Sequence, residues 1–241
     1  MPLIKPFANN KKNHLLSLLP EEEFQDLSPL LKPVRMAFKQ AVFERGHRID
    51  HVYFPCSSVF SILTFMRDGT AVEVGTVGNE GLAGIDILTG GDFATDTTIC
   101  QVEGESLRMQ VSDFRAALAK LPRLRQASQR YLQAYLSQVS QSVACNRLHT
   151  IEARFARWVL MTHDRVGDDE FHLTQEFLAD MLGVRRPSVS VVASAFQNAG
   201  LIRYSRGRLA IVDRSGLEQV CCECYGHVRS NFERLLSQRS T

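Results

Sequence analysis

Long apolar runs are missing from this sequence. No segment approaches the ~20 consecutive apolar residues that a membrane-spanning helix needs, and the N-terminus lacks the long apolar core of a signal peptide. Six cysteines in 241 residues are too sparse for a disulfide framework and are typical of a reducing compartment. These absences favour a cytoplasmic protein without a membrane partner. The length is sufficient for two domains, each with a core of its own.

Catalytic motifs are also missing. The sequence contains no Gly-x-Ser-x-Gly elbow, no phosphate-binding P-loop and no His-Glu-x-x-His pair. Nothing therefore indicates an enzyme, and no pattern identifies a cofactor. The sequence favours a binding function over catalysis.

Acidic residues are absent between Asp180 and Asp213, although the net charge of the whole chain is only +2. Five arginines lie in that stretch: Arg185, Arg186, Arg203, Arg206 and Arg208. A local excess of cations attracts the phosphates of nucleic acid. The stretch is therefore predicted to face double-stranded DNA.

The same stretch has the pattern of two short helices followed by a hairpin. Thr174 is a good N-cap for the first helix, and Gly183 can end that helix with a positive φ. Pro187 is tolerated in the first turn of the second helix, which Gly200 ends. Two strand-like runs, 201–204 and 209–212, flank a Ser-Arg-Gly-Arg turn. This order predicts a winged helix-turn-helix.

The preceding residues predict the rest of an α+β fold. Short β-rich runs separated by turns, from about 34 to 109, predict an antiparallel, jelly-roll-like β-roll. Residues 122 to about 146 contain neither glycine nor proline after the first position and predict one long helix. The predicted units are a β-roll (1–121), a long helix (122–147), a winged helix-turn-helix domain (148–214) and a helical tail (215–241).

The long helix carries an apolar seam with spacings of 4, 3 and 4 residues, formed by Leu132, Leu136, Val139 and Val143. Such spacing is typical of a coiled coil between two chains. The alternative is a stripe that packs into the core of its own chain. Dimerisation is the favoured interpretation, because helix-turn-helix proteins commonly bind palindromic sites as dimers.

This organisation resembles the Crp–Fnr family of bacterial transcription regulators. The resemblance covers roughly residues 13–214 and is strongest over Arg154–Leu160 and over Leu173–Ser190. It implies that Arg186 reads bases, that Ser188 contacts a phosphate or a base, and that Thr174 and Gln175 begin the helix that lies across the DNA backbone. The full set of predicted DNA contacts is Thr174, Gln175, Arg185, Arg186, Ser188, Ser190, Arg206 and Arg208.

Two positions depart from the family pattern. Pro187 stands where many members have a base-reading glutamate, and Val191 stands where some have a second base-reading arginine. The operator sequence of other members therefore does not transfer to this chain. We expect Arg185 and Arg186 to take over the reading, since each can bind a guanine with two hydrogen bonds.

The resemblance implies a cyclic-nucleotide-type pocket in the β-roll, but its charges are unsuitable for a phosphate. Neither arginine nor lysine occurs between Arg67 and Arg108, whereas several carboxylates do. A buried phosphate needs a cation or a nest of N–H donors. We therefore expect a sensor domain that does not bind cyclic AMP. The candidate effector-pocket residues are Glu80, Gly81, Leu82, Tyr131 and Tyr135.

The cysteines near the C-terminus are the densest sulfur group in the sequence. On one continuous helix Cys221, Cys224 and His227 would share a face and could form a metal-ligand stripe. Ordinary packing of small, soft side chains is the favoured alternative. The chain has no cysteine before Cys56, so it lacks the N-terminal cluster that holds an iron–sulfur centre in oxygen-sensing relatives.

The sequence thus predicts a homodimeric, sequence-specific DNA-binding transcription regulator. The partners expected by resemblance are RNA polymerase and an unidentified small-molecule or redox effector. Two alternatives remain: a redox- or metal-responsive regulator that uses its C-terminal cysteines, and an adaptor that uses the winged helix to contact protein.

Overall fold

The computed structural model describes residues 12–237. Two short helices come first, α1 (His14–Ser17) and α2 (Glu21–Leu27), followed by a 3₁₀ turn, Ser28–Leu30. Asn13 caps α1, because its side-chain oxygen accepts a hydrogen bond from Leu16 N at 3.1 Å. The Asn13 amide also donates to the carbonyl oxygens of Pro55 and Gly81, at 2.8 Å each. This residue therefore attaches the N-terminal helices to the strands that follow.

The predicted β-roll is confirmed as two antiparallel sheets, with strand orders β2-β6-β4-β5 and β1-β7-β3. Buried side chains such as Phe54, Phe60 and Val102 fill the space between the sheets. The seven strands are β1 (Lys32–Met36), β2 (Ala41–Phe43), β3 (His51–Pro55), β4 (Val59–Phe65), β5 (Ala71–Val77), β6 (Thr97–Val102) and β7 (Gly104–Gln110).

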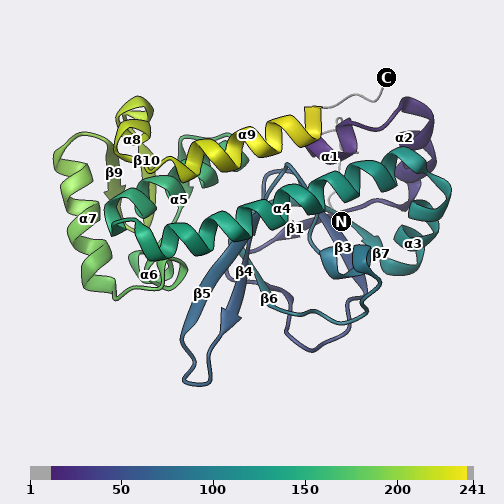
Figure 1. Ribbon diagram of the computed structural model, residues 1–241, viewed down its shortest axis with the longest axis horizontal. Helices are drawn as coiled ribbons and strands as arrows, with labels where there is room; N and C mark the ends of the chain where they lie inside the picture. Colours follow the sequence, from purple (N-terminus) through teal and green to yellow (C-terminus); the bar gives the residue numbers. More distant parts are fainter. Residues whose placement is uncertain (1–11, 238–241) are drawn as a thin grey trace, which may run out of the picture.

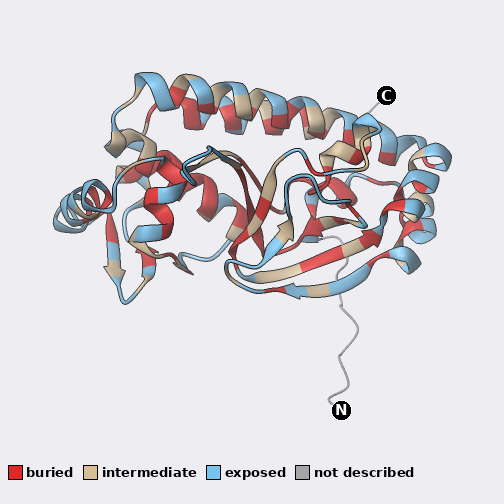
Figure 2. Ribbon diagram, turned by 90° about the horizontal axis from the view of Figure 1, so that it is seen from below, coloured by how far each residue is buried: buried red, intermediate tan, exposed pale blue. Residues whose placement is uncertain are grey.

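Helix α4 (Pro122–Leu148) runs along the roll and is the longest helix within residues 12–237. It follows α3 (Val111–Lys120). In Figure 2 the long helix lies along one edge of the molecule, with buried residues on its inner side and exposed residues on its outer side. Only one face of α4 therefore packs into the core.

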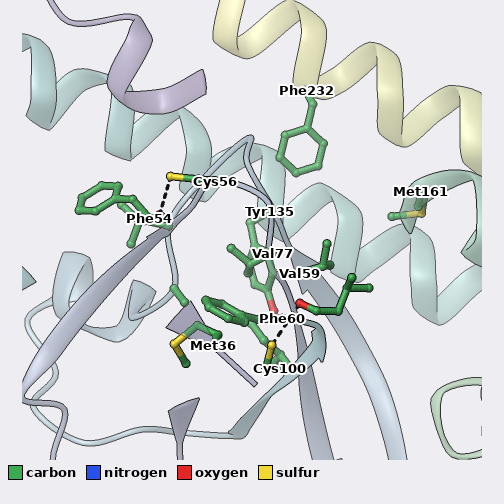
Figure 3. Packing of buried hydrophobic residues seen from close by; sticks show 14 of the residues in the cluster. Met36, Phe54, Cys56, Val59, Phe60, Val77, Cys100, Tyr135, Met161 and Phe232 are labelled. Atoms are coloured by element: carbon green, nitrogen blue, oxygen red, sulfur yellow. Dashed lines mark hydrogen bonds between the residues drawn. The ribbon is translucent and has the colours of Figure 1, made fainter. Parts of the chain in front are cut away.

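Two tyrosines of α4 enter the roll where two glycines leave room for them. A Cβ on Gly75 would lie 2.8 Å from the Tyr135 hydroxyl, and a Cβ on Gly81 would lie 1.8 Å from the Tyr131 ring. Figure 3 shows Tyr135 among Val59, Phe60 and Val77 in the apolar interior. These close contacts anchor α4 to β5 and to the loop that precedes the 3₁₀ turn Ile85–Thr89.

The C-terminal domain begins after a break in the helical chain. His149 is extended, and Thr150 caps α5 (Ile151–Val166) through a bond from Ala153 N. Residues 148–150, called the hinge below, thus connect the end of one helix to the start of the next. The domain continues with β8 (Glu170–His172), α6 (Gln175–Leu182), α7 (Arg186–Asn198), β9 (Ile202–Ser205) and β10 (Arg208–Ile211), and its sheet has the order β8-β10-β9.

Two further helices form the end of the described chain. Helix α8 (Arg214–Val220) packs against α5, so it is part of the C-terminal domain's core. Helix α9 (Cys224–Ser237) then runs back along α4 in the opposite direction (Figure 1). The tail predicted over 215–241 is helical as far as the structure describes it, and its last residues, 238–241, lie outside the described part. No helix within residues 12–237 is long and apolar enough to cross a membrane.

Candidate nucleic-acid interface and its junction with the β-roll

The turn between α6 and α7 exposes the predicted reading residues. Gly183 ends α6 in the left-handed conformation with φ 62°, and α7 starts three residues later with Pro187 in its first turn. Arg185, Arg186 and Ser188 are not buried at the start of α7. The buried side of α7 is apolar, and Phe196 packs edge-on against Phe155 of α5 with ring centroids 5.3 Å apart. The apolar side of α7 therefore fixes the helix on the domain, while the first turn of α7 stays accessible to a ligand.

The wing is a tight two-residue hairpin. Arg206 and Gly207 both have positive φ, 50° and 76°, as the hairpin turn of type I′ requires. Arg208 Nε donates to Glu170 Oε1 at 2.6 Å, so part of its charge is already neutralised by β8. Arg206, at the tip, is exposed. The tip arginine is consequently better placed than Arg208 to meet a phosphate.

A surface hollow of about 280 Å³ lies where α6, α7 and the wing meet. It is lined by Thr174, Gln175, Glu176, Arg186, Tyr204 and Gly207. Thr174 is the N-cap of α6 and accepts a bond from Phe177 N at 3.1 Å. A helix N-terminus next to an arginine suits a phosphate oxygen.

Ser190 has an internal partner that the sequence pattern did not show. Its hydroxyl donates to Gln175 Oε1 at 2.6 Å and lies 3.2 Å from Arg186 O. The bond connects the two helices and fixes their crossing. In this arrangement Ser190 positions α7, whereas Ser188 is the exposed serine of the pair.

The comparisons with known proteins agree with this geometry. Residues 153–220 match the family model of the Crp-like helix-turn-helix domain. This part of the chain is similar to Crp-like helix-turn-helix domains. The match ends with α8, whereas the sequence pattern placed the end of the domain at 214. Helix α9 lies beyond it.

Solved structures share the fold of most of the chain. FixK2 from Bradyrhizobium japonicum has 12% identity and a TM-score of 0.68, and the alignment covers 80% of this chain and 98% of that one. A CRP-family transcriptional regulator from Thermus thermophilus has 21% identity, a TM-score of 0.63 and coverages of 78% and 95%. The c-di-GMP-responsive regulator CLP of Xanthomonas campestris has 15% identity, a TM-score of 0.61 and coverages of 80% and 99%. The comparison with curated protein sequences gave no match.

A buried ion pair connects the Crp-like domain with the β-roll. Arg165 Nε of α5 donates to Glu80 Oε1 at 2.9 Å, and both side chains are almost completely enclosed. The same guanidinium donates to Gln138 Oε1 of α4 at 2.8 Å, and Gln138 donates to Thr76 O at 3.0 Å. One arginine of α5 thus contacts both the roll and the long helix.

A second polar network lies at the same junction. Trp158 Nε1 of α5 donates to Glu73 Oε1 at 3.0 Å. Ser61 Oγ lies 2.6 Å from Glu73 Oε2 and 2.5 Å from Gln101 Oε1, and Gln101 Nε2 donates to Thr162 Oγ1 at 2.8 Å. A hydroxyl has only one proton to donate. A protonated Glu73 that donates to Ser61 satisfies both contacts, and burial raises the pKa of Glu73 to about 7.

The predicted effector-pocket residues do come together, but as a packed cluster. Tyr131 and Leu82 have no exposed surface, and the Tyr131 ring lies against Gly81 and against Phe232 of α9, with ring centroids 6.2 Å apart. Glu80, which was expected to oppose an anionic ligand, is instead paired with Arg165. The neighbouring cavity, about 260 Å³, is lined by that pair itself and by α5 and α9 residues such as Asp164 and Tyr225.

The possible ligand stripe of Cys221, Cys224 and His227, to which ordinary packing was preferred, is not formed on one helix. Helix α8 ends at Val220 and α9 starts at Cys224, so Cys221 lies in the connection rather than on the helix that carries the other two residues. His227 is on the exposed side of α9, whereas Cys224 is buried. The non-helical connection between α8 and α9 therefore separates residues that one continuous helix would have aligned on a single face.

Proposed function

We propose that this chain is a sequence-specific, DNA-binding transcription regulator of the Crp–Fnr type. The observation that carries the proposal is the accessible Arg185–Arg186 pair at the start of α7, inside a Crp-like helix-turn-helix domain. The acid-free stretch around it gives the surface the charge that a phosphate backbone requires. A recognition helix in the major groove would carry these side chains to the base edges.

The exposed side of α7 offers a mixed set of base contacts. Arg185 and Arg186 supply charged donors, and Val191 is 70% exposed although it is apolar. An exposed valine on a recognition helix suits the methyl group of thymine. Pro187 supplies no donor or acceptor at the position of the family's glutamate. The expected operator therefore contains guanines and a thymine in its half-site and differs from that of members with the glutamate.

Replacing Arg186 by alanine should weaken binding to the cognate operator by ~1–3 kcal/mol and affect random DNA much less, because two hydrogen bonds to one guanine are lost. The matched variant is Arg206→Ala, at the wing tip, which should weaken operator and random DNA to similar extents because it removes a phosphate contact. Titrations of both duplexes at a fixed salt concentration measure the two effects. Equal weakening of both duplexes by Arg186→Ala would contradict the assignment.

We also propose that the chain acts as a homodimer through the outer side of α4. Leu136 and Val143 are 56% and 68% exposed in the single chain, and Val139 is half-buried beside them. A seam of large apolar side chains left open to water favours a partner helix over a core stripe. Two chains related by a twofold axis would present two recognition helices to one duplex, and the bound sequence would then be an inverted repeat.

The junction between the domains supports regulation by a population shift. A ligand that favours one orientation of the Crp-like domain over another would act through Glu80–Arg165, the network around Glu73 and the hinge at 148–150. The roll, in which Tyr131 fills the space beside Gly81, is expected not to take cyclic AMP, and micromolar binding in calorimetry would contradict this. RNA polymerase and the effector remain partners proposed by resemblance.

A further inference from the structure

Four metal-binding side chains meet where α4 ends and α9 begins. They are Cys145 in the last turn of α4, His149 immediately after that helix, Cys222 in the connection from α8, and Cys224 at the start of α9. Their ligand atoms all lie within 4.8 Å of one another, the three cysteines are buried, and His149 is half-buried. Residues from two distant parts of the sequence thus form one cluster.

Two separations within this cluster fit the edges of a tetrahedral site. Cys145 Sγ and Cys222 Sγ are 3.6 Å apart, and Cys224 Sγ is 3.5 Å from His149 Nδ1. Zinc binds thiolates at about 2.3 Å and imidazole at about 2.0 Å, so tetrahedral angles place sulfurs about 3.8 Å apart and a sulfur–nitrogen pair about 3.6 Å apart. The two distances therefore match two opposite edges of one coordination tetrahedron.

Three contacts around the cluster are of the kind that supports metal ligands. The other ring nitrogen of His149, Nε2, is 3.3 Å from Glu223 Oε1, which leaves Nδ1 to face the cysteines. A carboxylate on the outer nitrogen is the usual support of a metal-bound histidine. Gln141 Nε2 donates to Cys224 Sγ at 3.0 Å, as it would to a thiolate. The guanidinium of Arg157, which donates to Ser142 Oγ at 2.9 Å, supplies a cation near the cluster, which would offset part of the charge of metal-bound thiolates.

We propose that Cys145, His149, Cys222 and Cys224 bind one zinc ion per chain. Three thiolates and one imidazole are a donor set that suits zinc, and four protein ligands leave no coordination position open for substrate or water. The site is therefore of the structural type. The spacing also fits the chain: Cys145 and His149 are one helical turn apart, and Cys222 precedes the helix that begins with Cys224.

Zinc at this place would fasten α9 to the hinge. Helix α9 is otherwise held on α4 by contacts such as Asn231 Nδ2 to Ser137 Oγ, at 2.9 Å, and Phe232 against Tyr131. His149 lies between α4 and the first residue of the DNA-binding domain's α5. A bound ion would thus limit the orientations of that domain. Only this last consequence rests on the proposed function, because the metal site stands on its own contacts.

The test begins with the full chain, purified under reducing conditions with zinc present and then dialysed. Metal analysis should find one zinc per chain, and replacement by cobalt should give the absorption of a tetrahedral thiolate site. Cys222→Ser and His149→Ala should each weaken zinc binding at least ~10-fold. Their matched controls, Cys221→Ser and His227→Ala, should keep the wild-type affinity, because neither side chain belongs to the cluster.

Several results would overturn the proposal. These are a wild-type chain that holds no zinc, a cobalt spectrum without thiolate bands, or equal losses in the cluster variants and their controls. A Cys145–Cys222 disulfide in protein purified without air would likewise overturn it in favour of a redox pair. The cobalt spectrum needs only the wild-type chain, so a variant that fails to fold leaves the test intact. Loss of DNA binding in a chain that still holds zinc would count against the proposed function alone.

Discussion

Replacing Arg165 by alanine is expected to destabilise the chain by about 3–5 kcal/mol. The change leaves the buried Glu80 without its cation, and it also removes the donor to Gln138. An uncompensated buried carboxylate is costly because the low-dielectric interior cannot solvate it. Urea denaturation of wild type and variant, followed by circular dichroism, measures the loss.

An exposed ion pair of the same chain is the control. Arg115 and Asp92 are 2.7 Å apart, and both side chains are well exposed to solvent. Arg115→Ala should therefore cost no more than about 1 kcal/mol. The double variant Glu80→Gln with Arg165→Gln should lose less than Arg165→Ala alone, since no unpaired charge remains. A loss from Arg165→Ala as small as that from Arg115→Ala would contradict the role given to the buried pair.

The stability of the domain junction is expected to fall as the pH rises from about 4.5 to about 7, by up to about 3 kcal/mol. Burial raises the pKa of Glu73 from 4.5 to about 7, although Arg157 and Arg165 oppose the shift. The folded chain therefore binds the Glu73 proton more tightly than the unfolded chain does. The stabilisation that the bound proton gives is fully present below the pKa of Glu73 in the unfolded chain. It is lost as the pH rises through the pKa of Glu73 in the folded chain.

Urea midpoints measured across this pH range for wild type and Glu73→Gln isolate the contribution. The glutamine keeps an oxygen for Trp158 Nε1 and cannot ionise, so the variant should lack the wild-type decline. Histidines and other carboxyls titrate in both proteins and cancel in the comparison. Parallel pH profiles for the two proteins would show that Glu73 does not carry the effect.

The elements that carry function were predictable because their signals are local. The acid-free arginine stretch, the cap at Thr174 and the turn at Gly183 all lie within about forty residues and specify the helix-turn-helix. The long helix was predictable because residues 122–146 contain no glycine and no proline after the first position. The strands of the roll were recognised from alternation and turn residues, except β1, which contains Pro33 and is mostly exposed.

The junction and the cysteine cluster could not be predicted in the same way. Glu80 and Arg165 are 85 residues apart, and Cys145 and Cys222 are 77 apart. Only the folding of α9 back along α4 brings the second pair together. A local signal did exist, since Cys145 and His149 have the one-turn spacing of two ligands on a helix. The three-residue spacing of Cys221, Cys224 and His227 is the more conspicuous pattern in the sequence, but the end of α8 at Val220 takes Cys221 off the helix that carries the other two.

Selection of bound duplexes from a random DNA library tests the central claim most directly. The expected result is an inverted repeat whose half-sites contain guanines and lie about one helical turn, ~34 Å, apart. Such a sequence would show both base reading by α7 and the twofold symmetry of a dimer joined through α4. Enrichment of no sequence, or of a single half-site without its repeat, would contradict a dimeric, sequence-specific regulator.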